Sequence, residues 1–157
     1  MRLIVRRIAG FTLIELIVVI GILALVATVG FVLYRDYTRK QTVVQAGRSV
    51  QTVLVRTRQR ALSGERPDGC SGTLGGYRFS CMTGTGNYSV SALCDSSSPT
   101  VESGNLPSQV VFSSCVSFTF NVLGSGTDLA SDETVSLSGF AGAETESFVV
   151  QRSGVIQ

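Results

Sequence analysis

The fold is decided by residues 10–34, which read GFTLIELIVVIGILALVATVGFVLY. Residues 11–34 of this stretch are 24 residues long and hold one charged side chain, the carboxylate of Glu15. At about 1.5 Å per residue a helix of this length measures about 36 Å, which exceeds the roughly 30 Å of a bilayer's hydrocarbon core. The run therefore predicts a membrane-spanning helix over residues 11–34.

The segment before the apolar run is short and basic. Residues 1–10 read MRLIVRRIAG, and no cleavage site of small residues follows the run, as an ordinary secretory signal peptide requires. If a segment is removed, we expect it to be the basic decapeptide that ends at Gly10. Cleavage there would free the α-amino group of Phe11, which is a cation.

Glu15 is the residue that breaks the apolar pattern. A carboxylate at the centre of a bilayer costs about 2.5–3.5 kcal/mol, and less near an interface, so an acid inside such a span needs a partner. The freed amine of Phe11 on a neighbouring copy offers the opposite charge with an axial offset, which would set the register between subunits. The alternative is a polar residue tolerated near the lipid headgroups.

Beyond the apolar run the pattern predicts that the helix continues as an amphipathic helix over residues 35–62. Proline is absent from residues 36–62, and apolar or small residues recur every three or four positions. Ser63 and Gly64 then end the pattern, and Pro67 confirms the exit. The stripe expected to face the domain consists of Val43, Gly47, Val50, Leu54, Thr57 and Ala61.

Residues 63–157 read as a small β domain of short strands separated by turn residues. The expected strands cover residues 76–82, 87–94, 109–114, 116–122, 134–140 and 147–152, with a loop at 95–107. The predicted fold class is therefore α+β: a long N-terminal helix, membrane-spanning in its first half, packed on a small antiparallel sheet or sandwich.

All four cysteines lie in the β domain, and their spacing excludes the common zinc sites. Cys70, Cys81, Cys94 and Cys115 contain no CxxC pair, and the chain has no histidine. An even number of cysteines in a small domain after a membrane segment predicts two disulfides in an oxidising compartment. Three pairings are possible, and we favour Cys70–Cys81 with Cys94–Cys115 because these close the shortest loops. Buried free thiols are the alternative.

The charges are divided along the chain, and this division argues against a nucleic-acid-binding domain. Residues 1–62 hold ten basic and two acidic residues, for a net charge of +8, whereas residues 63–157 hold three arginines and nine acids, for a net charge of −6. An acidic folded part repels phosphate.

The absence of histidine also removes the commonest general base, so we expect no enzyme activity, no cofactor and no metal.

The N-terminus resembles that of type IV pilins and pseudopilins. Residues 10–16, GFTLIEL, are similar to the class III signal of that family, with the basic leader before it and the long apolar span after it. The C-terminal part more loosely resembles H-type pseudopilins of type II secretion systems and the FimT/FimU minor pilins. The residues that carry this second resemblance are NLP at 105–107, SFTFNVLG at 117–124 and RSGV at 152–155.

The resemblance implies a function and a set of partners. A prepilin peptidase would cut after Gly10 and methylate Phe11, and Glu15 would direct assembly with other pilin or pseudopilin subunits. The expected organisation is a leader at 1–10, a filament-core helix at 11–34, an amphipathic helix at 35–62 and a disulfide-stapled periplasmic domain at 63–157. The precursor would cross the bacterial inner membrane once, contacting lipid and an assembly platform, before it enters a filament.

Two other functions stay open from the sequence alone. The first is a DNA-uptake or adhesion module displayed on a pilus, which only the arginines at positions 56, 58 and 60 favour. Because residues i and i+2 of a helix point apart, we expect Arg56 and Arg60 to share a face without Arg58, and DNA is not an expected partner. The second is a membrane-anchored β domain unrelated to pilins, which would require that the leader stays uncut.

Overall fold

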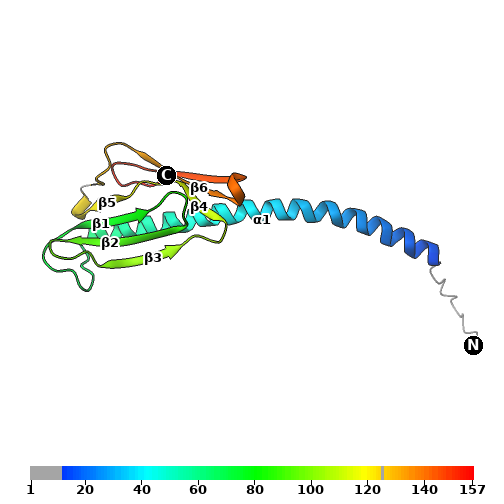
Figure 1. Ribbon diagram of the computed structural model, residues 1–157, viewed down its shortest axis with the longest axis horizontal. Coiled ribbons are helices and arrows are strands. Elements are labelled where there is room, and N and C mark those ends of the chain that lie inside the picture. Colours follow the sequence, from blue (N-terminus) through cyan, green and yellow to red (C-terminus); the bar gives the residue numbers. More distant parts are fainter. Residues whose placement is uncertain (1–11, 125) are drawn as a thin grey trace, which may run out of the picture. The chain divides into compact units, whose positions relative to one another are not determined.

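The computed structural model describes residues 12–124 and 126–157, so Gly10 and Phe11 lie outside the described residues. The chain divides into two compact units, of which the first ends at Thr38 and the second covers Arg39–Gln157. The element order is one long helix followed by seven strands (Figure 1). This is the predicted α+β class.

Helix α1 covers Leu13–Ser63, close to the expected bounds. At its start the Thr12 hydroxyl accepts a hydrogen bond from the amide of Glu15 at 3.3 Å. At its end Gly64 takes a left-handed backbone conformation, with φ of 63°, and its amide donates to the carbonyl of Ala61. These two features are the usual ways in which a helix satisfies the free backbone groups at its termini.

In the first unit the described side chains of α1 are largely exposed to solvent. Leu13 is 76% exposed, and the large apolar residues as far as Val26 are all at least 46% exposed. Within the described part of the chain, no helix combines the length and the apolarity that crossing a membrane demands.

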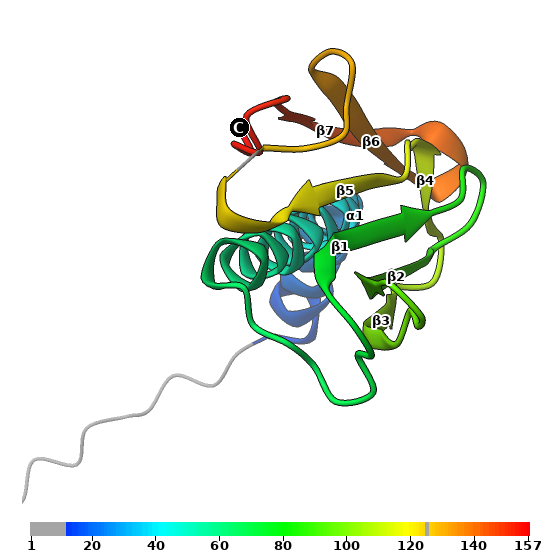
Figure 2. The same cartoon turned by 90° about the vertical axis from the view of Figure 1, so that its left-hand side faces the viewer.

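The second unit contains two antiparallel sheets. The larger sheet has the strand order β3-β2-β1-β5, and the smaller has the order β4-β6-β7 (Figure 2). The strands cover Leu74–Cys81 (β1), Asn87–Cys94 (β2), Thr100–Asn105 (β3), Val110–Ser114 (β4), Phe118–Asn121 (β5), Glu133–Gly139 (β6) and Glu144–Val150 (β7).

The core of the second unit lies between the two sheets and the part of α1 that starts at Arg39. The predicted helical stripe is buried: Val50, Leu54 and Thr57 are fully inaccessible to solvent. The strands contribute large side chains such as Tyr77 and Phe112, which are also inaccessible. Burying a side chain of this size stabilises the folded state by about 1.5–3 kcal/mol, so this helix face and these strands hold the unit together.

The helix contacts the smaller sheet at close range. A Cβ atom at Gly47 would lie 3.0 Å from the Cγ atom of Glu146 on β7, and one at Gly139 on β6 would lie 2.5 Å from a methyl group of Val43. Side chains at these positions would force the helix and the sheet apart. The two glycines therefore set the distance at which α1 packs on β6 and β7.

Three of the four sheet edges are covered, wholly or in part, by other segments of the chain. The middle of β4 pairs with the β1–β2 turn through Phe112, and β5 pairs with the segment that follows Gly126. The last residues of β7 exchange two hydrogen bonds with Gln157. For the outer edge of β3 the described residues provide no such partner.

The strand that the sequence did not predict is β3. Its residues TVESGN lie in the stretch that we expected to be a loop at 95–107. They lack the alternation of apolar and polar residues that marks a half-buried strand, and Val101 is its one large apolar side chain. The strand exists because β2 supplies the pairing partner, with Tyr88 opposite Gly104 and Val90 opposite Glu102.

Candidate assembly and binding sites

Glu15 lies in the first turn of α1, where the helix start gives its carboxylate a local role. Thr12 is the N-cap residue, and the bond from the Glu15 amide to its hydroxyl forms one half of a capping box, T-x-x-E. A negative charge in the first turn of a helix is favourable by about 0.3–1 kcal/mol. The sequence carries this signal as Thr12 three residues before Glu15, but the apolar pattern on which the prediction rested does not reveal it.

The surface around Glu15 is apolar. A shallow depression of about 380 Å³ is lined by Thr12, Ile14, Glu15, Val18 and Val19, and Ile14 is 71% exposed. A carboxylate within such a surface is poorly solvated as soon as another apolar surface covers it. Covering this region therefore requires a cation or a hydrogen-bond donor that meets Glu15.

The three arginines near the end of α1 fall into two groups, as the helical spacing predicts. Arg56 and Arg60 both contact Glu102 on β3, each with an N–O distance of 3.3 Å. The acid that pairs with them thus belongs to the same chain. Among the residues that the structure describes, Arg58 has neither an ion-pair nor a hydrogen-bond partner.

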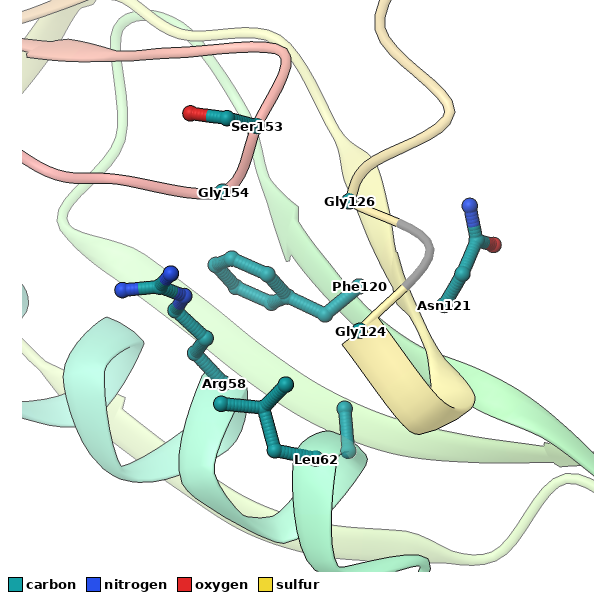
Figure 3. A pocket seen from close by; sticks show the side chains of 9 residues that line it. Arg58, Leu62, Phe120, Asn121, Gly124, Gly126, Ser153 and Gly154 are labelled. Atoms are coloured by element: carbon teal, nitrogen blue, oxygen red, sulfur yellow. The ribbon is translucent and has the colours of Figure 1, made fainter.

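Arg58 lines a small pit of about 30 Å³ at the C-terminal end of α1. Figure 3 shows its side chain and the Phe120 ring beside each other, with Ser153 and Gly154 on the opposite wall. A Cβ atom at Gly154 would lie 3.4 Å from the Arg58 Nε atom and 3.5 Å from the Phe120 ring, so glycine keeps the pit open. Leu62 and Gly124 complete one side of it.

The acidic turn at residues 128–133 has a structural role. The Asp128 carboxylate accepts a hydrogen bond from the Thr119 amide at 2.7 Å, and the Asp132 carboxylate accepts one from the Arg152 amide at 2.9 Å. These bonds hold the turn against β5 and the C-terminal segment. Over residues 12–124 and 126–157, no three histidine, cysteine, aspartate or glutamate side chains gather as metal ligands.

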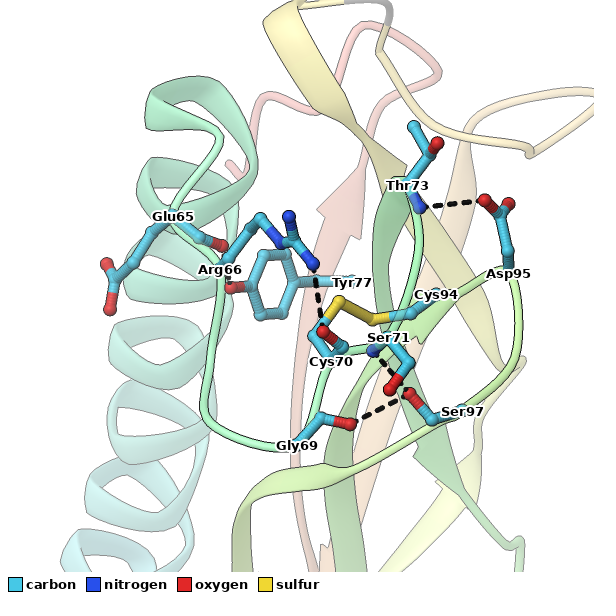
Figure 4. Close-up of a disulfide and its surroundings, with 10 residues drawn as sticks. All are labelled: Glu65, Arg66, Gly69, Cys70, Ser71, Thr73, Tyr77, Cys94, Asp95 and Ser97. Atoms are coloured by element: carbon cyan, nitrogen blue, oxygen red, sulfur yellow. Dashed lines mark hydrogen bonds between the residues drawn. A yellow bond between two sulfur atoms is a disulfide. The ribbon is translucent and has the colours of Figure 1, made fainter.

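The first disulfide joins Cys70, in the loop after α1, to Cys94 at the end of β2, with a Cα–Cα distance of 5.7 Å. Figure 4 shows the hydrogen bonds that surround it. The Ser97 hydroxyl donates to the Gly69 carbonyl and accepts from the Ser71 amide. The disulfide and these bonds fasten the loop after α1 to the β2–β3 loop.

Two further interactions stabilise the same loops. The Asp95 carboxylate accepts a 2.7 Å hydrogen bond from the Thr73 amide, and this bond, followed by one with the Thr73 side chain, lowers the pKa of Asp95. The Tyr77 hydroxyl donates to the backbone carbonyl of Glu65, and burial raises the pKa of this phenol. The loop that follows α1 is thus fixed to β1 as well as to β2.

The second disulfide joins Cys81, at the end of β1, to Cys115, which directly follows β4, with a Cα–Cα distance of 6.2 Å. The prediction of two disulfides is confirmed, and the favoured pairing of Cys70 with Cys81 and of Cys94 with Cys115 is wrong. Cys70 lies before the start of β1 and Cys81 lies at its end, so the length of the strand separates the two cysteines. The Cys70–Cys94 pairing follows the antiparallel neighbours β1 and β2, because Leu74 stands opposite Cys94. The Cys81–Cys115 bond instead joins the end of β1 in the larger sheet to the segment after β4 in the smaller sheet.

Residues 5–31 match the family described as the prokaryotic N-terminal methylation motif. The matched range contains Gly10, Phe11 and Glu15. No curated protein and no solved structure matches the chain. The match supports a type IV pilin-like chain, made as a membrane-anchored precursor that a prepilin peptidase processes, and it indicates a structural subunit that assembles with other pilins.

Proposed function

We propose that this chain is an H-type pseudopilin or a minor pilin, which enters a type II secretion pseudopilus or a type IV pilus through its N-terminal helix. Before assembly it crosses the bacterial inner membrane once, with residues 63–157 in the periplasm. The observation that carries the proposal is the methylation motif over residues 5–31, with an acid in the first turn of an exposed apolar helix.

The physical step behind assembly is the neutralisation of Glu15. When apolar side chains of neighbouring helices cover the surface around Glu15, its carboxylate loses water and needs a positive partner. Cleavage after Gly10 creates such a partner, the α-amino group of Phe11, on each subunit. A salt bridge between Glu15 and the Phe11 amine of a neighbour would fix the axial position of one helix against the next.

The disulfides support the periplasmic placement of the second unit. All four cysteines are paired, and disulfides persist in oxidising compartments such as the periplasm. The pairing of Arg56 and Arg60 with Glu102 supports leaving nucleic acid outside the proposal, because both guanidinium groups already contact a carboxylate of the same chain.

The test of Glu15 must separate its charge from its helix-capping role. Glutamine serves in a capping box as glutamate does, but it has no charge. We therefore expect the Glu15→Gln and Glu15→Ala variants to insert into the membrane normally. Their amount in sheared filaments, measured by immunoblot, should be lower than that of the unaltered chain by about tenfold or more. Thr12→Ala, which removes the cap and keeps the carboxylate, is the matched control and should assemble. Normal incorporation of Glu15→Gln would contradict the salt bridge.

The processing step has its own test. Replacing Gly10 with a large residue should leave an uncut precursor, and the intact mass should then include all residues of the leader. The unaltered chain from its native host should start at a methylated Phe11. If that chain still begins at Met1, the amine that the proposed salt bridge needs does not exist.

A further inference from the structure

We propose that the pit beside Arg58 is a docking site for an acidic peptide segment of a partner protein, in which an aspartate or glutamate is flanked by aliphatic residues. The site lies within the second unit and does not depend on Glu15 or on filament assembly. It therefore goes beyond the proposed function, and it can be tested separately.

The first reason is the unbalanced charge of Arg58. Its neighbours Arg56 and Arg60 share the carboxylate of Glu102, whereas Arg58 has no partner among the described residues and is half-buried. The planar guanidinium group binds carboxylates through paired hydrogen bonds, which are stronger than those between neutral groups. A carboxylate entering the pit would supply the acid that Arg58 lacks.

The second reason is the size and the wall of the pit. A volume of about 30 Å³ admits a group no larger than a water molecule or the end of a carboxylate. The lining includes the Phe120 ring and the backbone of Gly124, Gly126 and Gly154, beside Arg58, Ala61, Leu62, Asn121 and Ser153. The small volume excludes a large headgroup or a base, and it leaves the charged end of an aspartate or glutamate side chain as the fitting occupant.

The third reason is a pair of exposed leucines, of which Leu62 lines the pit and Leu123 directly precedes the lining residue Gly124 in the sequence. Leu123 is 81% exposed and has a left-handed backbone conformation, with φ of 58°. A leucine in this conformation is strained by about 1 kcal/mol, and glycine would fit without strain. Leu62 is 44% exposed, and its Cδ2 atom lies 3.5 Å from the position of a Cβ atom at Gly124.

An exposed leucine that also strains the backbone buries little apolar surface to offset that strain. Strain of this kind gathers where a side chain has a function. Leu62 and Leu123 are therefore the apolar part of the proposed docking site. Aliphatic side chains that flank the aspartate or glutamate of the partner segment would cover these two leucines. The combined site is a cation in a pit with apolar residues beside it, which fits a segment such as Leu-Asp-Leu.

The experiment uses the full chain, labelled with ¹⁵N in detergent micelles, and two synthetic probes. The probes are N-acetyl-Leu-Asp-Leu-amide and the uncharged N-acetyl-Leu-Asn-Leu-amide. We expect the aspartate peptide to shift the Arg58 Nε–Hε and Gly154 amide signals in a saturable way, with a Kd about tenfold below that of the asparagine peptide. Arg58→Gln should remove this difference. Arg48→Gln, an exposed arginine ten residues earlier on α1, should leave it unchanged.

The leucine half of the site has a distinct signature. Leu123→Gly should weaken both peptides by about threefold or more, while the urea midpoint stays unchanged or rises because the backbone strain is relieved. A fall of the midpoint together with the affinity would show a structural role and would overturn this part of the proposal.

Three results would overturn the docking site as a whole. The first is equal affinity for the aspartate and asparagine peptides. The second is a free acetate ion that binds as tightly as the aspartate peptide. The third is a duplex oligonucleotide that shifts the same signals in preference to the peptide, with a steep salt dependence, which would identify a phosphate site.

Discussion

The disulfide between Cys70 and Cys94 allows a quantitative prediction. We consider the double variant Cys70→Ala with Cys94→Ala, which opens a loop with a sequence separation of 24 residues. Loop-closure entropy for about 24 residues corresponds to about 3.5 kcal/mol at 25 °C. With an m value of about 1.3 kcal/mol/M, the urea midpoint of the second unit should fall by about 2.7 M.

Tyrosine fluorescence is a suitable assay, because the chain has no tryptophan and Tyr77 is fully buried in the second unit. The control is Cys81→Ala with Cys115→Ala, whose sequence separation of 34 gives a similar cost of about 3.8 kcal/mol. Each double variant should contain no titratable thiol. Two free thiols in either variant would refute the pairing, and a midpoint change below about 0.5 M would refute the entropic reasoning.

Two further predictions concern packing and pH. Gly139→Ala places a methyl group 2.5 Å from a methyl of Val43, so we expect the free energy of unfolding to fall by about 1–3 kcal/mol in a urea titration, and an unchanged midpoint would contradict this contact. The lowered pKa of Asp95 means that its bond to Thr73 stabilises the fold above the ordinary aspartate pKa of about 3.9 and is lost as the pH falls through the lower folded value. A carboxyl ¹³C titration by NMR should therefore give Asp95 a pKa below 3.9, and Asp95→Asn should reduce the loss of stability in acid.

The helix could be predicted from the sequence because its signals are local and periodic. The stripe from Val43 to Ala61 marks the buried face, and Gly64 marks the end, so the predicted end lies one residue from that of α1. The arginines followed the same geometry: helical spacing separates Arg58 from Arg56 and Arg60. What the spacing could not provide was the identity of the partner, because Glu102 is more than 40 residues away in the sequence.

The strand pairing and the disulfides depend on contacts between distant segments, and there the sequence was less informative. Strand β3 has a polar sequence, and its partner β2 decides its conformation. The cysteines pair according to which strand ends meet, whereas our preference for short loops considered only distance along the chain. The pit at Arg58 combines the helix, β5 and the C-terminal segment, which no local pattern brings together.

The uncovered edge of β3 has a consequence for how the domain behaves at high local concentration. An open strand edge is a template for another strand, and long apolar edges lead to aggregation. Strand β3 has only six residues, mostly small and polar, and its acid Glu102 is bound by two arginines of α1. Copies of this domain at high local concentration should therefore stay separate, because the edge of β3 is a poor template for joining the sheets of two copies into one continuous sheet.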